Sequence, residues 1–160
     1  DLFVGREFPV GELNEDFKLL TQMLLEVESF PILPKQCYHV YYRMNSNSRR
    51  KDKDDFSRVF TDIVVNADYI SELVAKHYPE LTDTAFRFGM VQRLDYMLHI
   101  PISKMTKDND FYKAVCSFIR KNVFKAIGNK ILTKKNKVYL VLFAVAPKTL
   151  RVIHAKIKGL

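Results

Sequence analysis

The feature that most constrains this fold is a helical repeat of apolar residues running from Asp54 to the end of the chain. Apolar side chains recur there at steps of three and four residues, the spacing of one face of an α-helix. Pro79, Pro101 and Pro147 interrupt the pattern, and Gly128 marks a further break. Because proline disrupts a helix and glycine commonly ends one, the sequence predicts separate helices that pack on one another.

Residues that favour helix starts divide this region into five expected helices. Each is bounded by a capping residue or a proline at its start and by a proline or glycine at its end. The expected helices are Asp54 to Pro79, Thr82 or Asp83 to Pro101, Asp108-Asn109-Asp110 to Gly128, Thr133 to Pro147, and Pro147 to Lys158.

The first 53 residues have a different character. A helix is expected over Asn14–Glu28, with Asn14 as N-cap. The apolar face of that helix is expected to comprise Phe17, Leu20, Leu24 and Val27.

Tyr38–Arg43 is rich in aromatic and β-branched residues and predicts a strand, with Phe30–Leu33 as its nearest partner. The exposed edge of that strand is expected to favour a homodimer. The predicted fold is therefore mainly α: a helical bundle, residues 51–160, following a short α/β remnant, residues 1–50.

Charge is divided unevenly along the chain. Residues 1–100 hold 12 Lys and Arg against 16 Asp and Glu, whereas residues 101–160 hold 14 against 2. This split predicts an anionic partner at the C-terminal end, either membrane headgroups or nucleic acid. The aromatic residues of that region fall on the inner stripe of their helix, which argues against nucleic acid. Residues 130–158 suit a helix on an anionic membrane face, or an ordinary amphipathic helix that closes the bundle.

Location is constrained by cysteine usage and by hydropathy. Cys37 and Cys116 form no C-x-x-C pair, which indicates a reduced, cytoplasmic protein. The longest apolar run, Val138–Ala146, is nine residues, well short of the ~20 that a spanning helix requires. We therefore expect a cytoplasmic protein that attaches peripherally to the inner face of the membrane through residues 101–160.

Two motifs follow one another in the N-terminal segment. The first is Phe8-Pro9-Val10-Gly11-Glu12-Leu13-Asn14-Glu15-Asp16 and the second is Tyr38-His39-Val40-Tyr41-Tyr42-Arg43-Met44-Asn45-Ser46. They resemble the F-x-x-G-x-x-x-E-D and Y-x-Y-x-x-R-x-x-S segments of bacterial family-2 inverting glycosyltransferases of the GT-A type. Val40 departs from the aromatic residue usual at that position.

The resemblance implies an enzyme of polysaccharide biosynthesis that moves a sugar from a nucleotide diphosphate sugar to a glycan or lipid-linked acceptor. It implies Asp16 as general base, Glu15 as its acidic neighbour, and Arg43 and Ser46 as donor contacts. The chain begins at Asp1 within the pattern, as expected of a C-terminal part of a longer enzyme that is inactive without its nucleotide-binding half.

The resemblance also implies a divalent metal, Mn²⁺ or Mg²⁺, in the full-length enzyme. This chain contains two D-x-D sequences, Asp52-Lys53-Asp54 and Asp108-Asn109-Asp110, but both open expected helices and are interpreted as caps. No cofactor or metal is therefore expected in this chain.

The alternative is a non-catalytic helical module that serves interaction or membrane docking. In that case Glu15 and Asp16 only complement the positive end of the helix dipole.

Overall fold

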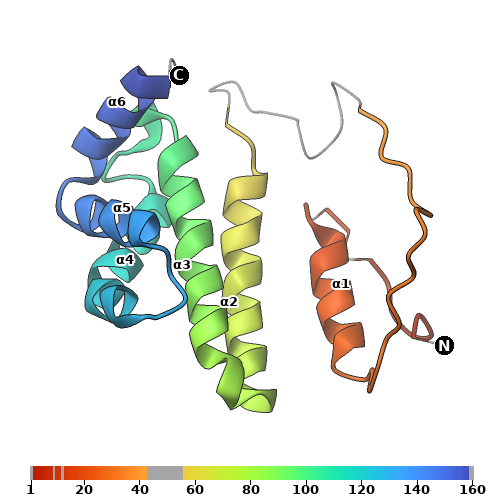
Figure 1. Cartoon of the computed structure of the whole chain (residues 1–160). Coiled ribbons are helices and arrows are strands. Elements are labelled where there is room, and N and C mark those ends of the chain that lie inside the picture. Colours follow the sequence, from red (N-terminus) through yellow and green to blue (C-terminus); the bar gives the residue numbers. More distant parts are fainter. Residues whose placement is uncertain (1, 9, 12, 43–55, 159–160) are drawn as a thin grey trace.

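The computed structural model describes residues 2–8, 10–11, 13–42 and 56–158, and the fold of these residues is mainly α (Figure 1). Two short 3-10 turns, η2 (Pro79–Leu81) and η3 (Ile102–Lys104), flank the third α-helix. The α-helices of the described residues are α1 (Glu15–Leu24), α2 (Val59–His77), α3 (Thr82–His99), α4 (Asp110–Gly128), α5 (Lys134–Val145) and α6 (Pro147–Lys158). The predicted helical bundle is confirmed, and the division at residue 50 stays a prediction.

Helix α3 lies at the centre of the bundle. It packs against α2 on one side and against α4, α5 and α6 on the other (Figure 1). A helix that is covered on several sides must be apolar on several sides. Its buried residues accordingly extend well around its circumference: Ala85, Gly89, Met90, Arg93, Leu94, Tyr96 and Met97.

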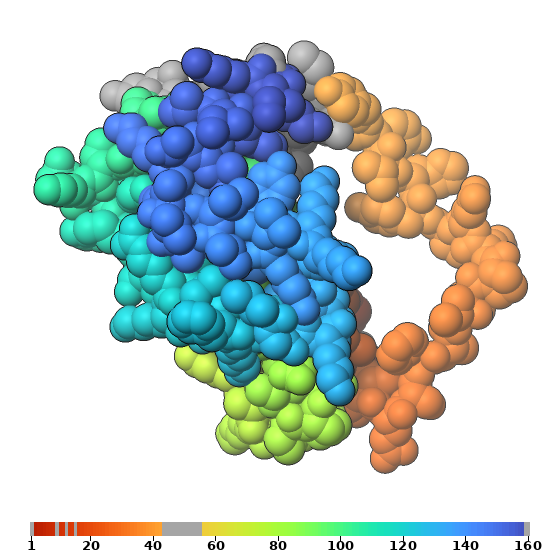
Figure 2. Space-filling model, turned by 60° about the vertical axis from the view of Figure 1, so that its left-hand side comes forward, coloured from red at the N-terminus to blue at the C-terminus, as the bar shows by residue number. Residues whose placement is uncertain are grey.

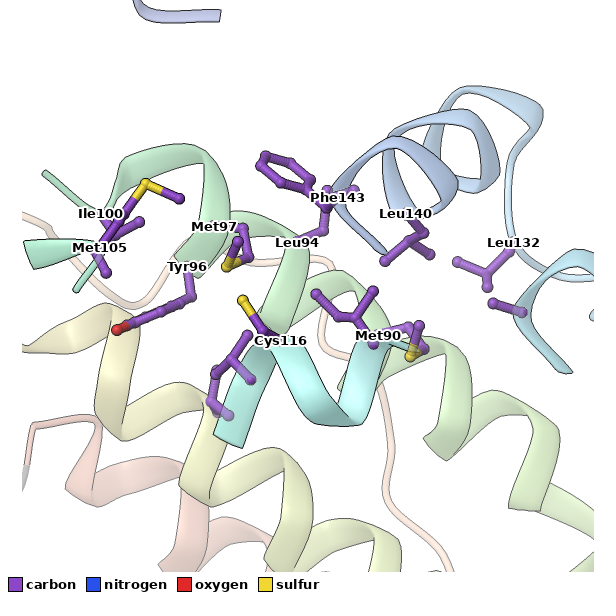
Figure 3. Close-up of a cluster of buried hydrophobic side chains, with 14 of the residues drawn as sticks. Met90, Leu94, Tyr96, Met97, Ile100, Met105, Cys116, Leu132, Leu140 and Phe143 are labelled. Carbon is purple, nitrogen blue, oxygen red and sulfur yellow. The ribbon is translucent and has the colours of Figure 1, made fainter. Parts of the chain in front are cut away.

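The hydrophobic core forms where α4, α5 and the α3–α4 connection meet α3 (Figure 3). Its largest fully buried side chains include Tyr96, Met97 and Phe143. The connection after α3 contributes Ile100 and Met105, so the chain between the helices is also part of the core.

Most of the expected helix starts and stops are confirmed. The Tyr112 amide donates to the Asn109 side chain at 3.0 Å, so Asn109 caps α4. The Asn136 amide donates to Thr133 Oγ1 at 3.2 Å, so Thr133 caps α5 in the same way. Pro147 is the first residue of α6.

The expected cap of α3 is wrong. Leu81 occupies the N-cap position, and Thr82 is already helical. The Thr82 hydroxyl donates to the Pro79 carbonyl at 2.6 Å, so it turns back onto η2 and does not accept from the first turn of α3. The 3-10 turn formed by Pro79–Leu81 leads directly into the helix.

Helix α1 is shorter than predicted, and its predicted apolar face is covered only in part, with the Phe17 ring stacked on Phe88 of α3. It ends at Leu24, because the chain tightens there into i→i+3 hydrogen bonds such as Leu25 N–H to the Gln22 carbonyl at 3.3 Å. Leu19 and Met23 are buried, whereas Leu20 and Leu24 of the predicted face are exposed. Both sets have helical spacing, and only the position of the neighbouring helices decides which one is covered.

The predicted strand is not formed in its described part. Residues 38–42 run as exposed, irregular chain, and Arg43 lies outside the described residues. β-propensity reflects the fit of side chains to a sheet surface, so it specifies no strand without a partner. No other segment of the described chain forms a strand beside these residues.

We expect Phe143→Ala to lower the free energy of unfolding by about 3–5 kcal/mol, because it opens a cavity in the core beside α3. Phe143 is 1% exposed, whereas Phe124 on α4 is 84% exposed. Phe124→Ala is therefore the matched control and should change stability by no more than about 0.5 kcal/mol. Urea unfolding followed by circular dichroism measures both; equal losses would contradict the assigned core.

Candidate functional site

The candidate catalytic residue lies in the first turn of α1. Two residues before the helix adopt left-handed backbone conformations: Gly11 with φ +80° and Asn14 with φ 60°. They turn the chain into α1, which starts at Glu15, whose side chain lies outside the described part. Asp16 follows, and its side chain is exposed. The turn thus presents the predicted base to solvent.

Polar side chains of α2 hold the turn that precedes Asp16. The Leu13 amide donates to Asp62 Oδ2 at 3.1 Å, and the Arg58 guanidinium donates to the Gly11 carbonyl. Arg58 Nε also pairs with Asp62 Oδ2 at 2.9 Å. The start of α2 therefore positions the start of α1.

Arg58 and Asp62 were not expected as site residues. Their i,i+4 spacing of opposite charges is a signal for an ion pair on one helix. That spacing does not reveal that both side chains also bind the backbone of a segment almost fifty residues earlier.

A hollow of about 190 Å³ lies between α1 and α2, lined by Lys18, Arg58, Asp62, Val65 and Asn66. Asn66 is 2% exposed and its Nδ2 has no hydrogen-bond partner. The hollow is smaller than the roughly 300–1,000 Å³ of ordinary ligand pockets, so it does not accommodate a nucleotide sugar. Asp16 is not among its lining residues.

The second motif does not join the first in the described residues. Tyr38, Val40, Tyr41 and Tyr42 are all exposed, and their segment arches away from the helical body (Figure 2). Arg43 and Ser46 lie outside the described residues.

Of the two D-x-D sequences, only Asp108-Asn109-Asp110 lies within the described residues. Asp110 Oδ1 pairs with Lys113 Nζ at 2.7 Å, and this hydrogen bond and charge lower the pKa of Asp110. Asp52-Lys53-Asp54 lies outside the described residues. Within the described chain, no three His, Cys, Asp or Glu side chains come close enough to share a metal ion.

Buried arginines are a second feature that the sequence did not predict. Arg93 on α3 donates to both oxygens of Asp68 on α2, at 2.6 and 2.8 Å, and its guanidinium lies 3.6 Å from the centre of the Phe118 ring on α4. One buried cation thus connects α2, α3 and α4. Its role is structural.

The second buried arginine, Arg151 on α6, has no carboxylate partner among the described residues. Its Nε donates to the Ile100 carbonyl at 2.9 Å, and its Nη1 has no hydrogen-bond partner. Burial lowers the pKa of Arg151. Burial also lowers the pKa of His154, one turn further on, and the positive charges of Arg151 and Lys158 lower it further.

No family model, curated protein or solved structure matches this chain.

We expect Arg93→Lys to destabilise the protein by about 1–3 kcal/mol. The Arg93 guanidinium contacts Asp68 through Nη2 and the Gly89 carbonyl through Nη1 at 3.2 Å, and a lysine cannot make both contacts or stack flat on Phe118. Arg87→Lys, on the same helix but only partly buried, is the matched control and should stay within about 0.5 kcal/mol of the parent in chemical denaturation. An unchanged midpoint for Arg93→Lys would show that the pair does not connect the helices.

Stability should also depend on pH through His154. Its folded pKa lies below the ordinary value of 6.5, so the unfolded chain takes up a proton first. The contribution of the neutral His154 side chain to the free energy of unfolding is present above pH 6.5 and is lost as the pH falls below that value. We therefore expect the free energy of unfolding to fall less between pH 7 and pH 5 in His154→Gln than in the parent.

The exposed His77 supplies the control for this measurement. His77→Gln should lose as much stability as the parent over the same pH range, measured by urea unfolding. A parent-like loss in His154→Gln would contradict the assignment.

Proposed function

We propose that this chain is the acceptor-side part of an inverting GT-A-type glycosyltransferase, with Asp16 as its general base. The substrates are a nucleotide diphosphate sugar and a hydroxyl of a glycan or lipid-linked acceptor. The proposal rests on the two sequence motifs and on one observation in the structure: the apolar surface of residues 2–42.

The candidate base lies within the segment that carries this surface. In residues 2–42, Leu19 and Met23 are the buried apolar side chains, and most other large ones face solvent. The exposed ones are Leu2, Phe3, Val4, Phe8, Val10, Leu20, Leu24, Phe30, Ile32, Leu33, Tyr38, Val40, Tyr41 and Tyr42. Soluble proteins seldom leave so much apolar surface in one region uncovered, so this segment is suited to pack against a further structural unit.

The nucleotide-binding half of the same enzyme is the partner that fits. It would cover the apolar side chains of the segment and supply a sheet edge to which Tyr38–Tyr42 could add as a strand. The exposed face of α1 that begins at Asp16 continues into Leu20 and Leu24, so packing on that face would enclose the carboxylate. Packing and catalysis would then depend on the same side of one helix.

The proposed step is a single displacement. The Asp16 carboxylate takes the proton of the acceptor hydroxyl while that oxygen attacks the anomeric carbon from the face opposite the leaving group. The new C–O bond forms as the bond to the diphosphate breaks, and the nucleoside diphosphate leaves with the electron pair. Donor binding, including any Mn²⁺ or Mg²⁺ that assists departure of the diphosphate, belongs to residues other than those described here.

A second candidate is a helical interaction module without chemistry. It is favoured by the separation of the core, which lies in α2–α6 and their connections, from residues 2–42. The coding sequence immediately upstream of Asp1 distinguishes the two. A strand-rich segment that ends in D-x-D supports the enzyme, and a start codon within a few residues supports the module.

In an enzyme that joins this chain to its nucleotide-binding half, Asp16→Asn should lower the transfer rate by a factor on the order of 10²–10⁴. Donor affinity should stay unchanged, because the substitution removes a proton acceptor and no donor contact. Release of nucleoside diphosphate measures the rate, and calorimetry measures donor binding.

The matched control is Asp83→Asn. Asp83 is also an exposed carboxylate in the first turn of a helix, α3, so its removal causes the same loss of dipole stabilisation, ~0.3–1 kcal/mol. It should leave the transfer rate unchanged. If Asp16→Asn also retained a rate within a few-fold of the parent, the proposed base would be wrong.

A further inference from the structure

An apolar ridge lies along the outer side of α5. Val138, Leu142 and Val145 follow one another at steps of four and three residues, and all three are exposed. The buried residues of α5, Leu140 and Phe143, lie on the opposite side of the helix. The ridge therefore takes no part in the core.

Two lysines precede this ridge on the same helix. Lys134 and Lys135 form the first turn of α5, and both are exposed. At helical spacing, Lys134 lies directly before Val138 on the same side of the helix. One face of α5 thus combines two cations with three aliphatic side chains.

The neighbouring helices repeat this composition. On α6, Ile153, Lys156 and Ile157 are all exposed. On α4, the exposed Phe124 follows the exposed Lys121 by one turn.

The three helices form one surface. Arg120 Nε of α4 donates to the Ala144 carbonyl of α5 at 3.0 Å, so α4 lies against the end of the α5 ridge. Figure 2 shows α4, α5 and α6 side by side on one face of the molecule. We call this surface the α4–α6 outer face, defined by Lys121, Phe124, Lys134, Lys135, Val138, Leu142, Val145, Ile153, Lys156 and Ile157.

The part of the sequence that forms this face supplies no acidic side chain beyond Asp110 at the start of α4. Residues 111–160 contain no Asp or Glu, and the two acids of residues 101–160, Asp108 and Asp110, precede or begin α4. The positive charge of the face is therefore available to an external anion.

We propose that the α4–α6 outer face docks onto an anionic phospholipid membrane. Lysines would contact lipid phosphates, while the aliphatic ridge enters the boundary between headgroups and acyl chains, as in helices that lie in the membrane plane. Helix α5 has 12 residues and is about 18 Å long, enough for three apolar turns along the surface. No helix of the described chain is long and apolar enough to cross the bilayer.

The same features disfavour other occupants of this face. A second copy would place like charges against one another. Single-stranded nucleic acid needs aromatic platforms, and Phe124 is the one exposed aromatic residue of described residues 101–158. Exposed valine, leucine and isoleucine have no complement on a phosphate backbone, whereas a membrane offers both an anionic surface and an apolar layer.

The test is sedimentation of the chain with vesicles. Neutral phosphatidylcholine vesicles are compared with vesicles containing roughly one third phosphatidylglycerol, at about 0.1 M and about 1 M salt. We expect binding only to the anionic vesicles, with most of it lost at about 1 M salt, where screening shortens to ~3 Å. Equal binding to both vesicles, or binding to neither, would overturn the proposal.

Two matched pairs of variants locate the surface. Lys134→Gln/Lys135→Gln should weaken binding by a factor on the order of 10–30, since each lysine near an anionic surface contributes ~1 kcal/mol. Lys35→Gln/Lys76→Gln removes the same net charge from exposed sites elsewhere and should retain at least a third of the parent affinity. An equal loss in both would show that only net charge matters, which would refute a defined docking face.

The second pair tests the apolar ridge. Val138→Ser/Leu142→Ser/Val145→Ser should remove the binding that survives at high salt, whereas Val4→Ser/Val10→Ser/Ile32→Ser, at exposed sites of the N-terminal segment, should not. All six positions are exposed, and circular dichroism checks that each variant folds.

Loss of binding in the N-terminal variant alone would place the docking surface elsewhere and refute the proposal. Salt-sensitive binding to single-stranded RNA without any lipid binding would refute it as well. Vesicle binding by this chain does not depend on the glycosyltransferase proposal, so each can fail without the other.

Discussion

The packing of four helices around α3 is the constraint on which the rest of the structure depends. Helices α2, α4, α5 and α6 all pack on it, and each buries a face that would otherwise be exposed to water. The same burial makes the charge of Arg93 costly, and its contacts with Asp68 and Phe118 compensate for that cost. Hydrophobic packing thus holds the bundle together, and one buried cation fixes how α2 and α4 lie against its central helix.

The N-terminal segment is attached by different forces. Asp62 and Arg58 bind the backbone at Leu13 and Gly11, and Gln22 Nε2 donates to the Tyr69 hydroxyl at 3.2 Å. Its apolar contacts with the bundle come from α1, where Leu19 and Met23 are buried and the Phe17 ring stacks on Phe88 of α3 at 5.6 Å. A segment held by a few polar bonds, with most of its apolar side chains uncovered, is suited to complete its packing against another unit. The candidate base lies on this segment, so its environment depends on that packing.

The two proposed surfaces lie on opposite sides of the molecule. Helix α1 flanks α2, whereas α4, α5 and α6 flank α3, so the α2–α3 pair separates the candidate base from the basic face (Figure 1). Charge follows the same division, since the acids concentrate in residues 1–100 and the cations in residues 101–160. Attachment through the basic face would leave the turn that carries the candidate base on the side away from the lipid surface.

Local sequence signals determined where α4, α5 and α6 start, because a cap or a proline acts on its own few residues. Asn109, Thr133 and Pro147 therefore sit where the pattern placed them. Tertiary structure alone decided which face each helix buries. Leu19 and Met23 are covered in place of Leu20 and Leu24, Arg93 is buried within α3, and Tyr38–Tyr42 form no strand. These outcomes depend on neighbours distant in sequence. A helix with two apolar faces can bury either one, and the packing of other helices decides which. A strand-like segment without a partner forms no strand.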